Sequence, residues 1–527
     1  MDYFDAPSST KENTMAYFVL LQFGKCVQSL QRFISVRLFP PRPQDLPLMS
    51  QCCYWIPSAV KTLALCHAAN ETSRRIPFEQ FYNESLTHLD LLSDYFQWQT
   101  RSLRAAFSFC SYPFLLSISA KRTILVGQAE QQMLASARES IIGNLARMQL
   151  PHVDMMFLTI TARRDHLLED SLRELSKQAG NLRKKLKIQF SGEAGLDMGG
   201  LTKEWFQLLI EEIFRQDYGM FTYHSGTEVY WFSSSEAAMD SLEEFNLVGV
   251  LMGLAVYNGV LLDVHMPLCC YKKLLSPAVP SAARLGDDES SFGAIAPSLE
   301  DLASISPDLA RGLQQLLDYD GDVVRDIGLA FEITTDEFGE SRTEELKAGG
   351  SSIAVDTANR NEYARLYADW WLNSAVKTQF NAFYRGFHSV CASNVLSLLR
   401  PEEVELLVCG CPNFNFPELQ SVSTYDGFKA TDQTIRDFWE VALAMPEAKQ
   451  KRLLRFVTGS DRVPAGGMRH MALRISKLST SGEELPHRLP VAHTCFNQLV
   501  LPDYRSRTLL ENKLTVALAH GEGFGLE

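Results

Sequence analysis

The longest apolar run in the sequence, LVGVLMGLAVYNGVLL at residues 247–262, is the feature that most constrains the fold. The run is short for a bilayer and is bounded by Glu244 and Asp263, so it favours a helix inside a protein core over a membrane span. Gly249 and Gly253 stand four positions apart, which lets another backbone approach closely. We therefore expect a buried core helix with close packing.

The overall charge limits the classes of partner. The chain carries a formal net charge of −13, whereas binding to phosphate backbones requires a basic surface, so nucleic acid is not expected as a partner. The N-terminal sequence MDYFDAPSSTKE is acidic and does not resemble a signal peptide. We expect a protein without a membrane partner.

Eleven cysteines are distributed without a metal-binding or disulfide pattern. Because no CxxC pair is followed by a second CxxC, the sequence predicts no structural zinc site, and we expect neither a metal nor a cofactor. Free thiols in this number favour a reducing compartment, the cytoplasm, with the nucleus as an alternative.

A strand, a glycine-rich turn and a helix are predicted in succession at residues 186–190, 191–202 and 203–214. This order is also typical of phosphate-binding loops. The turn contains no GK[ST] or GxGxxG motif, and its acidic residues Glu193 and Asp197 would repel phosphate. A structural turn is therefore the better interpretation.

Residues 276–308 are rich in Ser, Ala, Pro and Gly and predict a flexible surface insertion. The next segment, 306–319, predicts an amphipathic helix capped by Ser306, with Pro307 in its first turn. Its apolar stripe consists of Leu309, Leu313, Leu316 and Leu317. Such a stripe indicates either a core face or a partner-binding groove, and the spacing alone does not decide between them.

The segment CGCPNFNFPEL at residues 409–419 contains prolines and a glycine and predicts a domain boundary. Beyond it, LPVAHTCFNQLVLPDY at residues 489–504 places Cys495 between two prolines, with His493 two positions before it. Prolines interrupt regular structure, so this cysteine could be an exposed nucleophile. A small buried hydrophobe is an equally good interpretation of the local sequence.

Five blocks follow one another along the chain: GEAGLDMGGLTKEWF (192–206), GLAVYNGVLLDVHMPLCCYKKLL (253–275), FVTGSDRVPAGG (456–467), the Cys495 segment and GFGLE (523–527). Together these blocks resemble the HECT-domain E3 ubiquitin-protein ligases. A single TCFN would be weak evidence, but these blocks in this order are specific. The segment VDTANRNEY (355–363) departs from the usual V-T-N-E-N pattern, which leaves the efficiency of any reaction open.

The resemblance implies an α+β fold with two lobes. The implied segments are a helical N-terminal extension (1–164), a larger and mostly helical N-lobe (165–411) with an E2-binding subdomain at roughly 300–367, a hinge (412–418), and a smaller α/β C-lobe (419–527). The C-lobe would carry the active cysteine, and the hinge would let it face two partners in turn.

The resemblance also implies the reaction and the residues that perform it. Cys495 would accept ubiquitin as a thioester from a ubiquitin-charged E2 enzyme and pass it to a lysine of a protein substrate. His493 and Thr494 are candidates to assist, and Phe524 would act as a docking plug during transfer. The E2-binding residues implied by the resemblance are Leu309, Leu313, Leu316, Tyr363 and Tyr367.

Two other functions fit parts of the sequence. A cysteine protease also pairs a cysteine with a histidine, but a papain-like nucleophile lies near the mature N-terminus with its histidine far downstream, whereas His520 is the sole histidine after Cys495. A catalytically silent scaffold that binds ubiquitin or E2 is the second alternative, and the TCFN block and the C-terminal tail argue against it.

Overall fold

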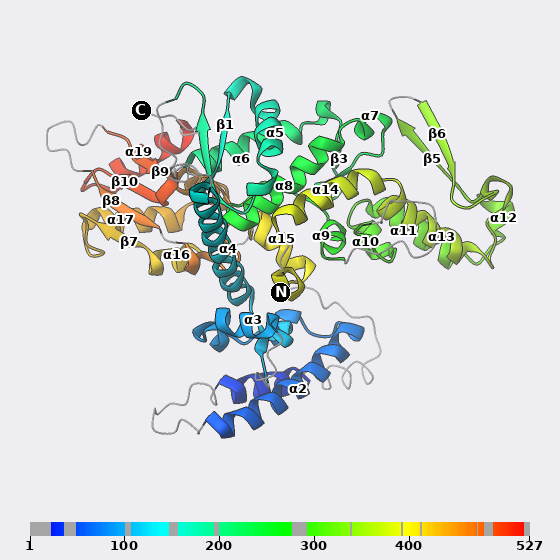
Figure 1. Cartoon of the computed structure of the whole chain (residues 1–527), viewed down its shortest axis with the longest axis horizontal. Coiled ribbons are helices and arrows are strands. Elements are labelled where there is room, and N and C mark those ends of the chain that lie inside the picture. Colours follow the sequence, from blue (N-terminus) through cyan, green and yellow to red (C-terminus); the bar gives the residue numbers. More distant parts are fainter. Residues whose placement is uncertain are drawn as a thin grey trace. The chain divides into compact units, whose positions relative to one another are not determined.

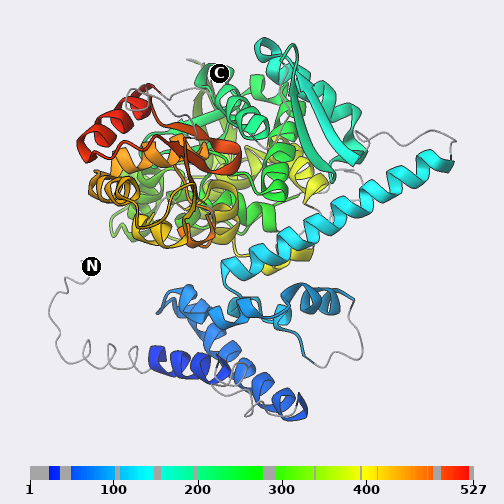
Figure 2. The ribbon, with the colours of Figure 1, turned by 90° about the vertical axis from the view of Figure 1, so that its left-hand side faces the viewer.

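The computed structural model describes most of the chain in eleven segments. They are residues 23–35, 49–100, 107–146, 156–193, 200–276, 292–337, 340–391, 394–411, 414–471, 473–478 and 488–520. Two units are distinguished by their internal contacts: unit 1 contains Met1–Gln128 with Asn394–Leu399, and unit 2 contains Ala129–Ser393 with Arg400–Glu527 (Figures 1 and 2).

Unit 1 is helical in its described residues. Its elements are a helix over residues 23–35, α2 (Met49–Ser73), α3 (Leu91–Gln99), the first part of α4 (Ile118–Ala146), and 3₁₀ helices at Phe78–Phe81, Glu84–His88, Phe109–Ser111, Pro113–Leu115 and Asn394–Leu398. Asn83 is buried and joins two of these elements, because its amide donates to the carbonyl oxygen of Gln31 at 3.2 Å while its oxygen caps the helix that begins at Glu84.

The first part of unit 2, which we call the larger lobe, comprises residues 156–391 and 400–411. Its helices are α5 (Leu167–Lys177), α6 (Gly200–Ile213), α7 (Glu236–Met239), α8 (Leu242–Asn258), α9 (Leu268–Leu275), α10 (Leu299–Ala303), α11 (Pro307–Asp318), α12 (Val323–Asp326), α13 (Arg360–Asp369), α14 (Lys377–Val390) and α15 (Pro401–Cys409). Its strands form three pairs: β1 (Phe157–Ala162) parallel to β2 (Lys185–Phe190), β3 (Phe221–His224) antiparallel to β4 (Val229–Phe232), and β5 (Glu332–Glu337) antiparallel to β6 (Glu340–Glu345).

Helices α8 and α14 form the centre of the larger lobe. A Cβ atom added at Gly249 would lie 2.0 Å from the carbonyl oxygen of Phe383, and one added at Gly386 would lie 2.0 Å from that of Asn246. Since neither helix tolerates a side chain at these points, the two backbones touch directly. The prediction of a buried, closely packed helix is confirmed, although the helix ends at Asn258 because Gly259 takes a left-handed φ of 68°.

The smaller lobe comprises the described residues from 414 to 520. Its elements are α16 (Phe416–Val422), β7 (Thr424–Asp426), α17 (Gln433–Ala444), α18 (Glu447–Thr458), β8 (Arg474–Lys477), β9 (Val491–His493), β10 (Gln498–Leu501) and α19 (Arg507–His520). The strands form one sheet in the order β7-β8-β10-β9, in which β8 is parallel to both neighbours and β9 is an antiparallel edge.

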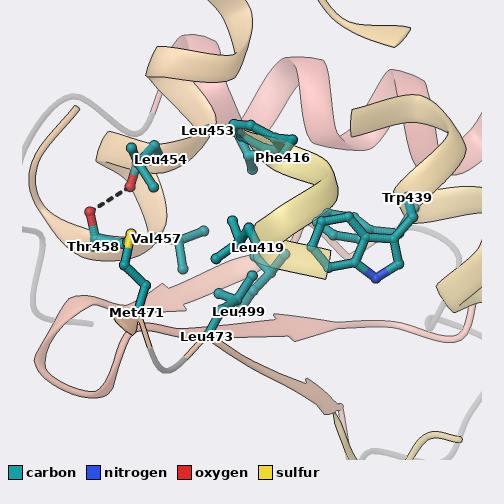
Figure 3. Close-up of a pocket in the computed structure, with 11 residues that line it drawn as sticks. Phe416, Leu419, Trp439, Leu453, Leu454, Val457, Thr458, Met471, Leu473 and Leu499 are labelled. Atoms are coloured by element: carbon teal, nitrogen blue, oxygen red, sulfur yellow. Dashed lines mark hydrogen bonds between the residues drawn. The ribbon is translucent and has the colours of Figure 1, made fainter. Parts of the chain in front are cut away.

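The core of the smaller lobe contains a cavity of about 10 Å³ (Figure 3). Apolar side chains from α16, α17 and α18 line the cavity. Leu499 of β10 and Leu473, which directly precedes β8, line it from the side of the sheet. Thr458 also lines the cavity, but its hydroxyl donates to the carbonyl oxygen of Leu454 at 2.8 Å. A cavity of this size and polarity has no room or partners for a ligand, so it is a packing defect of the core and not a binding site.

The α10–α13 subdomain, residues 299–369, has a separate small core and connects to α14 through a π-helix at Trp370–Ser374. The buried ammonium of Lys273 fixes this connection, because its Nζ donates to the carbonyl oxygen of Leu372 at 2.8 Å and to Oδ1 of Asn373 at 2.9 Å. Burial lowers the pKa of Lys273 to about 8. The connection is therefore held by a specific polar contact as well as by packing.

Several expectations about individual elements can now be compared with the structure. The α+β fold class and the predicted strand at 186–190 are confirmed by β2 and its neighbours. Residues 277–291 of the predicted insertion lie outside the described residues, but residues 299–303 form α10 with Leu302 fully buried, so the insertion is shorter than predicted. Strand β1 pairs with β2, so residues 157–162 pack with the larger lobe.

We predict that Gly249→Ala lowers the free energy of unfolding by about 1–3 kcal/mol, because the added methyl group must push α14 away from α8. The control is Gly312→Ala, an exposed position in α11 where nothing lies within 4 Å of an added Cβ. It should stabilise the chain by up to about 1 kcal/mol. Urea denaturation followed by tryptophan fluorescence compares the two, and an unchanged midpoint for Gly249→Ala would contradict the direct backbone contact.

Candidate functional site

Cys495 lies in the turn that connects β9 to β10. The turn is a 3₁₀ helix over Thr494–Phe496, and it ends at Asn497, whose φ of 47° is left-handed. Asparagine tolerates this conformation better than most residues, which lets the chain reverse direction in so few positions. The backbone of Asn497 is then held by its carbonyl oxygen, which accepts from the amide of Arg474 at 3.0 Å. We call residues 494–497 the cysteine turn.

The surroundings of the cysteine turn are exposed and largely apolar. Phe496, directly after the cysteine, is 53% exposed, and Val491 on the edge strand β9 is 48% exposed. His493 is exposed as well, and the half-buried Thr494 contributes a backbone carbonyl to contacts described below. Within the described residues, β9 is an edge strand of the sheet, next to β10.

A lysine of the larger lobe reaches the cysteine turn. Nζ of Lys203, in the first turn of α6, lies 2.9 Å from the carbonyl oxygen of Thr494 and 3.4 Å from Oδ1 of Asn497. It also lies 3.1 Å from the carbonyl oxygen of Thr458, at the end of α18. The sequence did not predict a role for Lys203. Two of its acceptors are backbone carbonyl oxygens, which every residue has, so no residue type marks them.

The two lobes also meet where the chain passes between them. The amide of Cys411 donates to the carbonyl oxygen of Val463 at 2.7 Å, and the amide of Val463 donates back at 3.1 Å. Arg462 contacts His265, whose pKa is lowered by burial and by the Arg462 charge, so a neutral imidazole can accept from the guanidinium.

The segment expected to act as a hinge, residues 412–418, is only partly described. Residues 412 and 413 lie outside the described residues. Helix α16 begins at Phe416, whose ring is buried in the core of the smaller lobe, so residues 416–418 are part of that lobe. The connecting segment between the lobes is therefore Cys411 to Asn415.

Three of the residues predicted to contact E2 belong to the core of the α10–α13 subdomain. Leu313 and Leu316 are each 5% exposed and Tyr363 is 4% exposed, so they do not form an open groove in this structure. Leu309 and Tyr367 are half-buried at the edge of that core. Ser306 occupies the N-cap position of α11 as predicted, but its side chain accepts no capping hydrogen bond.

The exposed apolar residues of the subdomain lie beyond the predicted stripe. Tyr319 follows α11, and Val324 and Ile327 lie in and after α12. Their exposed fractions are 36%, 46% and 40%. Sequence periodicity could not separate this surface from the core, because a short helix such as α12 has too few residues to show a repeat. We call these three side chains the α12 surface.

Figure 1 shows β9 and β10, which the cysteine turn connects, at one end of unit 2 and α12 at the other end. The smaller lobe, drawn in orange and red, packs beside α6, while α11, α12 and α13 extend from the other side of α14. The two regions therefore lie on different sides of α14 in this arrangement of the lobes.

Three buried cysteines of the larger lobe are poor nucleophiles. Burial raises the pKa of Cys269, Cys391 and Cys409 to about 12, so these thiols stay protonated at physiological pH.

Within the described residues, no cluster of three or more His, Cys, Asp or Glu side chains could hold a metal ion. No helix in that part of the chain has the length and hydropathy that crossing a membrane requires.

Comparison with known proteins decides the family. The family model described as "HECT-domain (ubiquitin-transferase)" matches residues 207–527 of the 527-residue chain, a range that includes the cysteine turn and the α10–α13 subdomain. The chain therefore belongs to the HECT-domain family. The resemblance seen in the sequence blocks is confirmed.

Named relatives agree with the family assignment. The chain is 50% identical over 509 residues to "Probable E3 ubiquitin-protein ligase HECTD2" of Mus musculus and, over the same length, to its Homo sapiens counterpart. It is 35% identical over 534 residues to "Probable E3 ubiquitin-protein ligase mug30" of Schizosaccharomyces pombe. Each alignment covers 96% of this chain, but 64% of the two HECTD2 proteins and 63% of mug30.

We predict that Leu313→Asp unfolds the α10–α13 subdomain locally, at a cost of about 3 kcal/mol or more, because it buries a carboxylate without a partner. Ile327→Asp places the same charge on the α12 surface and should change stability by about 0.5 kcal/mol or less. Hydrogen exchange of the α11 and α13 amides measures the difference. Equal protection in the two variants would contradict the assignment of Leu313 to the core.

Proposed function

We propose that the chain is an E3 ubiquitin ligase that carries ubiquitin on Cys495 between an E2 enzyme and a substrate lysine. The observation that carries the proposal is the position of Cys495 within the HECT-matched region, in a turn whose neighbours His493 and Phe496 are exposed. Exposed neighbours on both sides of the cysteine favour the approach of another protein to this turn.

The proposed reaction has two steps. The Cys495 thiolate attacks the thioester carbonyl of ubiquitin-charged E2; a new C–S bond forms, the old one breaks, and the E2 cysteine leaves as a thiolate. The neutral amine of a lysine then attacks the Cys495 thioester; a C–N bond forms, the C–S bond breaks, and one amine proton is lost to solvent or a nearby base. The first step exchanges bonds of like energy, so it requires little activation beyond access and position.

The surroundings of the cysteine turn support ubiquitin as the acyl group. The carboxyl-terminal tail of ubiquitin is an extended peptide, and the edge strand β9 offers unpaired backbone groups to such a peptide. Val491 and Phe496 would lose exposed apolar area on binding, which favours association. His493 is a candidate for the proton acceptor in the second step, because it is exposed and close to Cys495 in the chain.

The α12 surface is the proposed site for E2. Tyr319, Val324 and Ile327 expose apolar side chains on a small subdomain, as expected for the centre of a protein interface. Leu309 and Tyr367 border the same core and could extend the contact, while Leu313, Leu316 and Tyr363 would support it from below. The partners proposed for this chain are thus charged E2, ubiquitin and a lysine-bearing protein.

We predict that Cys495→Ala abolishes the reductant-sensitive ubiquitin adduct that forms when the chain is mixed with charged E2. Cys411→Ala removes a half-buried thiol at the lobe junction and should leave the adduct unchanged. Non-reducing gels after a short incubation provide the measurement. A silent scaffold would show no adduct in any variant, and an adduct that persists in Cys495→Ala would place the acceptor elsewhere.

A second prediction concerns Phe524, which lies outside the described residues. We propose that its ring docks on the larger lobe during transfer to lysine, an interaction worth about 2 kcal/mol. Phe524→Ala should leave loading of Cys495 nearly normal and slow transfer to lysine about 10- to 100-fold. Leu526→Ala, which removes a nearby apolar side chain, is the matched control. Single-turnover assays separate the two steps, and equal slowing of both by Phe524→Ala would contradict the docking role.

A further inference from the structure

Lys203 of the larger lobe donates hydrogen bonds to residues that flank Cys495 in the smaller lobe. The acceptors of its ammonium lie on both sides of Cys495 in the chain: the carbonyl oxygen of Thr494 immediately before it, and the side chain of Asn497 two positions after it. The position of this ammonium is thus tied to the position of the cysteine turn. Two other interlobe contacts among the described residues, at Cys411 and Arg462, involve neither Thr494 nor Asn497.

The third acceptor of Lys203 strengthens the contact. Thr458 is the last residue of α18, and a carbonyl at a helix C-terminus lacks an intrahelical partner and lies at the negative end of the helix dipole. Lys203 is half-buried, so water competes less for its ammonium than at an open surface. Hydrogen bonds from a charged donor in such a position are stronger than those between neutral groups.

The contact belongs to one arrangement of the lobes. Lys203 lies on α6, on the side of unit 2 opposite to the α12 surface (Figure 1). With E2 at the α12 surface, as proposed above, the Lys203 contact forms on the side of the larger lobe away from E2. The contact therefore has no role in loading.

We propose that Lys203 is a positioning residue for the second half-reaction. By holding the carbonyl oxygen of Thr494 and the side chain of Asn497, it fixes the thioester on Cys495 against the α6 side of the larger lobe while a lysine attacks. This inference rests on the proposed ligase function and adds a residue to it. It predicts that Lys203 acts on discharge of ubiquitin and not on loading.

The test compares the two half-reactions in Lys203→Met, Lys203→Arg and wild type. In Lys203→Met, loading from charged E2 should proceed at the wild-type rate, because the contact has no role in loading. Discharge of the loaded chain to excess free lysine should slow about tenfold, the effect of losing charge-assisted hydrogen bonds. Lys203→Arg keeps the charge and the donors and should recover most of the discharge rate.

The matched control is Lys185→Met, which removes an exposed lysine of β2 in the same lobe. It should leave both rates unchanged. A general structural defect in Lys203→Met would slow loading and discharge together, and a contact without function would slow neither; either result overturns the proposal. If the wild type forms no thioester at all, the ligase function itself is contradicted, and the assay reports this before any variant is compared.

Discussion

The direct contact of α8 with α14 is the constraint on which the larger lobe depends. Gly249 and Gly386 bring the two backbones together, and both helices then lead to functional regions. Beyond the end of α8, the amide of Leu262 donates to the carbonyl oxygen of Val408 in α15, which runs into the connecting segment. At the other end, α14 follows the π-helix that holds the α10–α13 subdomain. The two proposed protein-binding sites are therefore supported by one pair of helices.

The contacts within the larger lobe differ in kind from the contacts between the lobes. In the core of the larger lobe, the backbones of α8 and α14 touch directly. Between the lobes, the described contacts include hydrogen bonds at Cys411, Arg462 and Lys203. Contacts of this kind can exchange without disturbing either core. Gly410, with a φ of 73° and Val463 O 2.8 Å from an added Cβ, lets the chain leave the larger lobe close to the smaller one.

Much of the fold follows from the sequence because the signals are local. The apolar run predicted α8, and the spacing of Leu309, Leu313 and Leu316 predicted α11. The same spacing could not distinguish core from groove, since an apolar stripe is equally compatible with burial inside the chain and burial against a partner. Lys203 could not be predicted either: its acceptors lie 255, 291 and 294 positions away, and two of them are carbonyl groups that any residue would supply. The candidate cysteine, in contrast, is predicted by a local sequence block.

The central claim is that Cys495 carries ubiquitin as a thioester, and mass spectrometry of the wild-type chain tests it most directly. The chain is mixed with charged E2, quenched in acid within seconds, and analysed intact and after digestion. The account predicts a mass increase of one ubiquitin that is removed by thiol reagents and maps to the peptide containing Cys495. An increase that resists thiol reagents, or that maps to another cysteine, would contradict it.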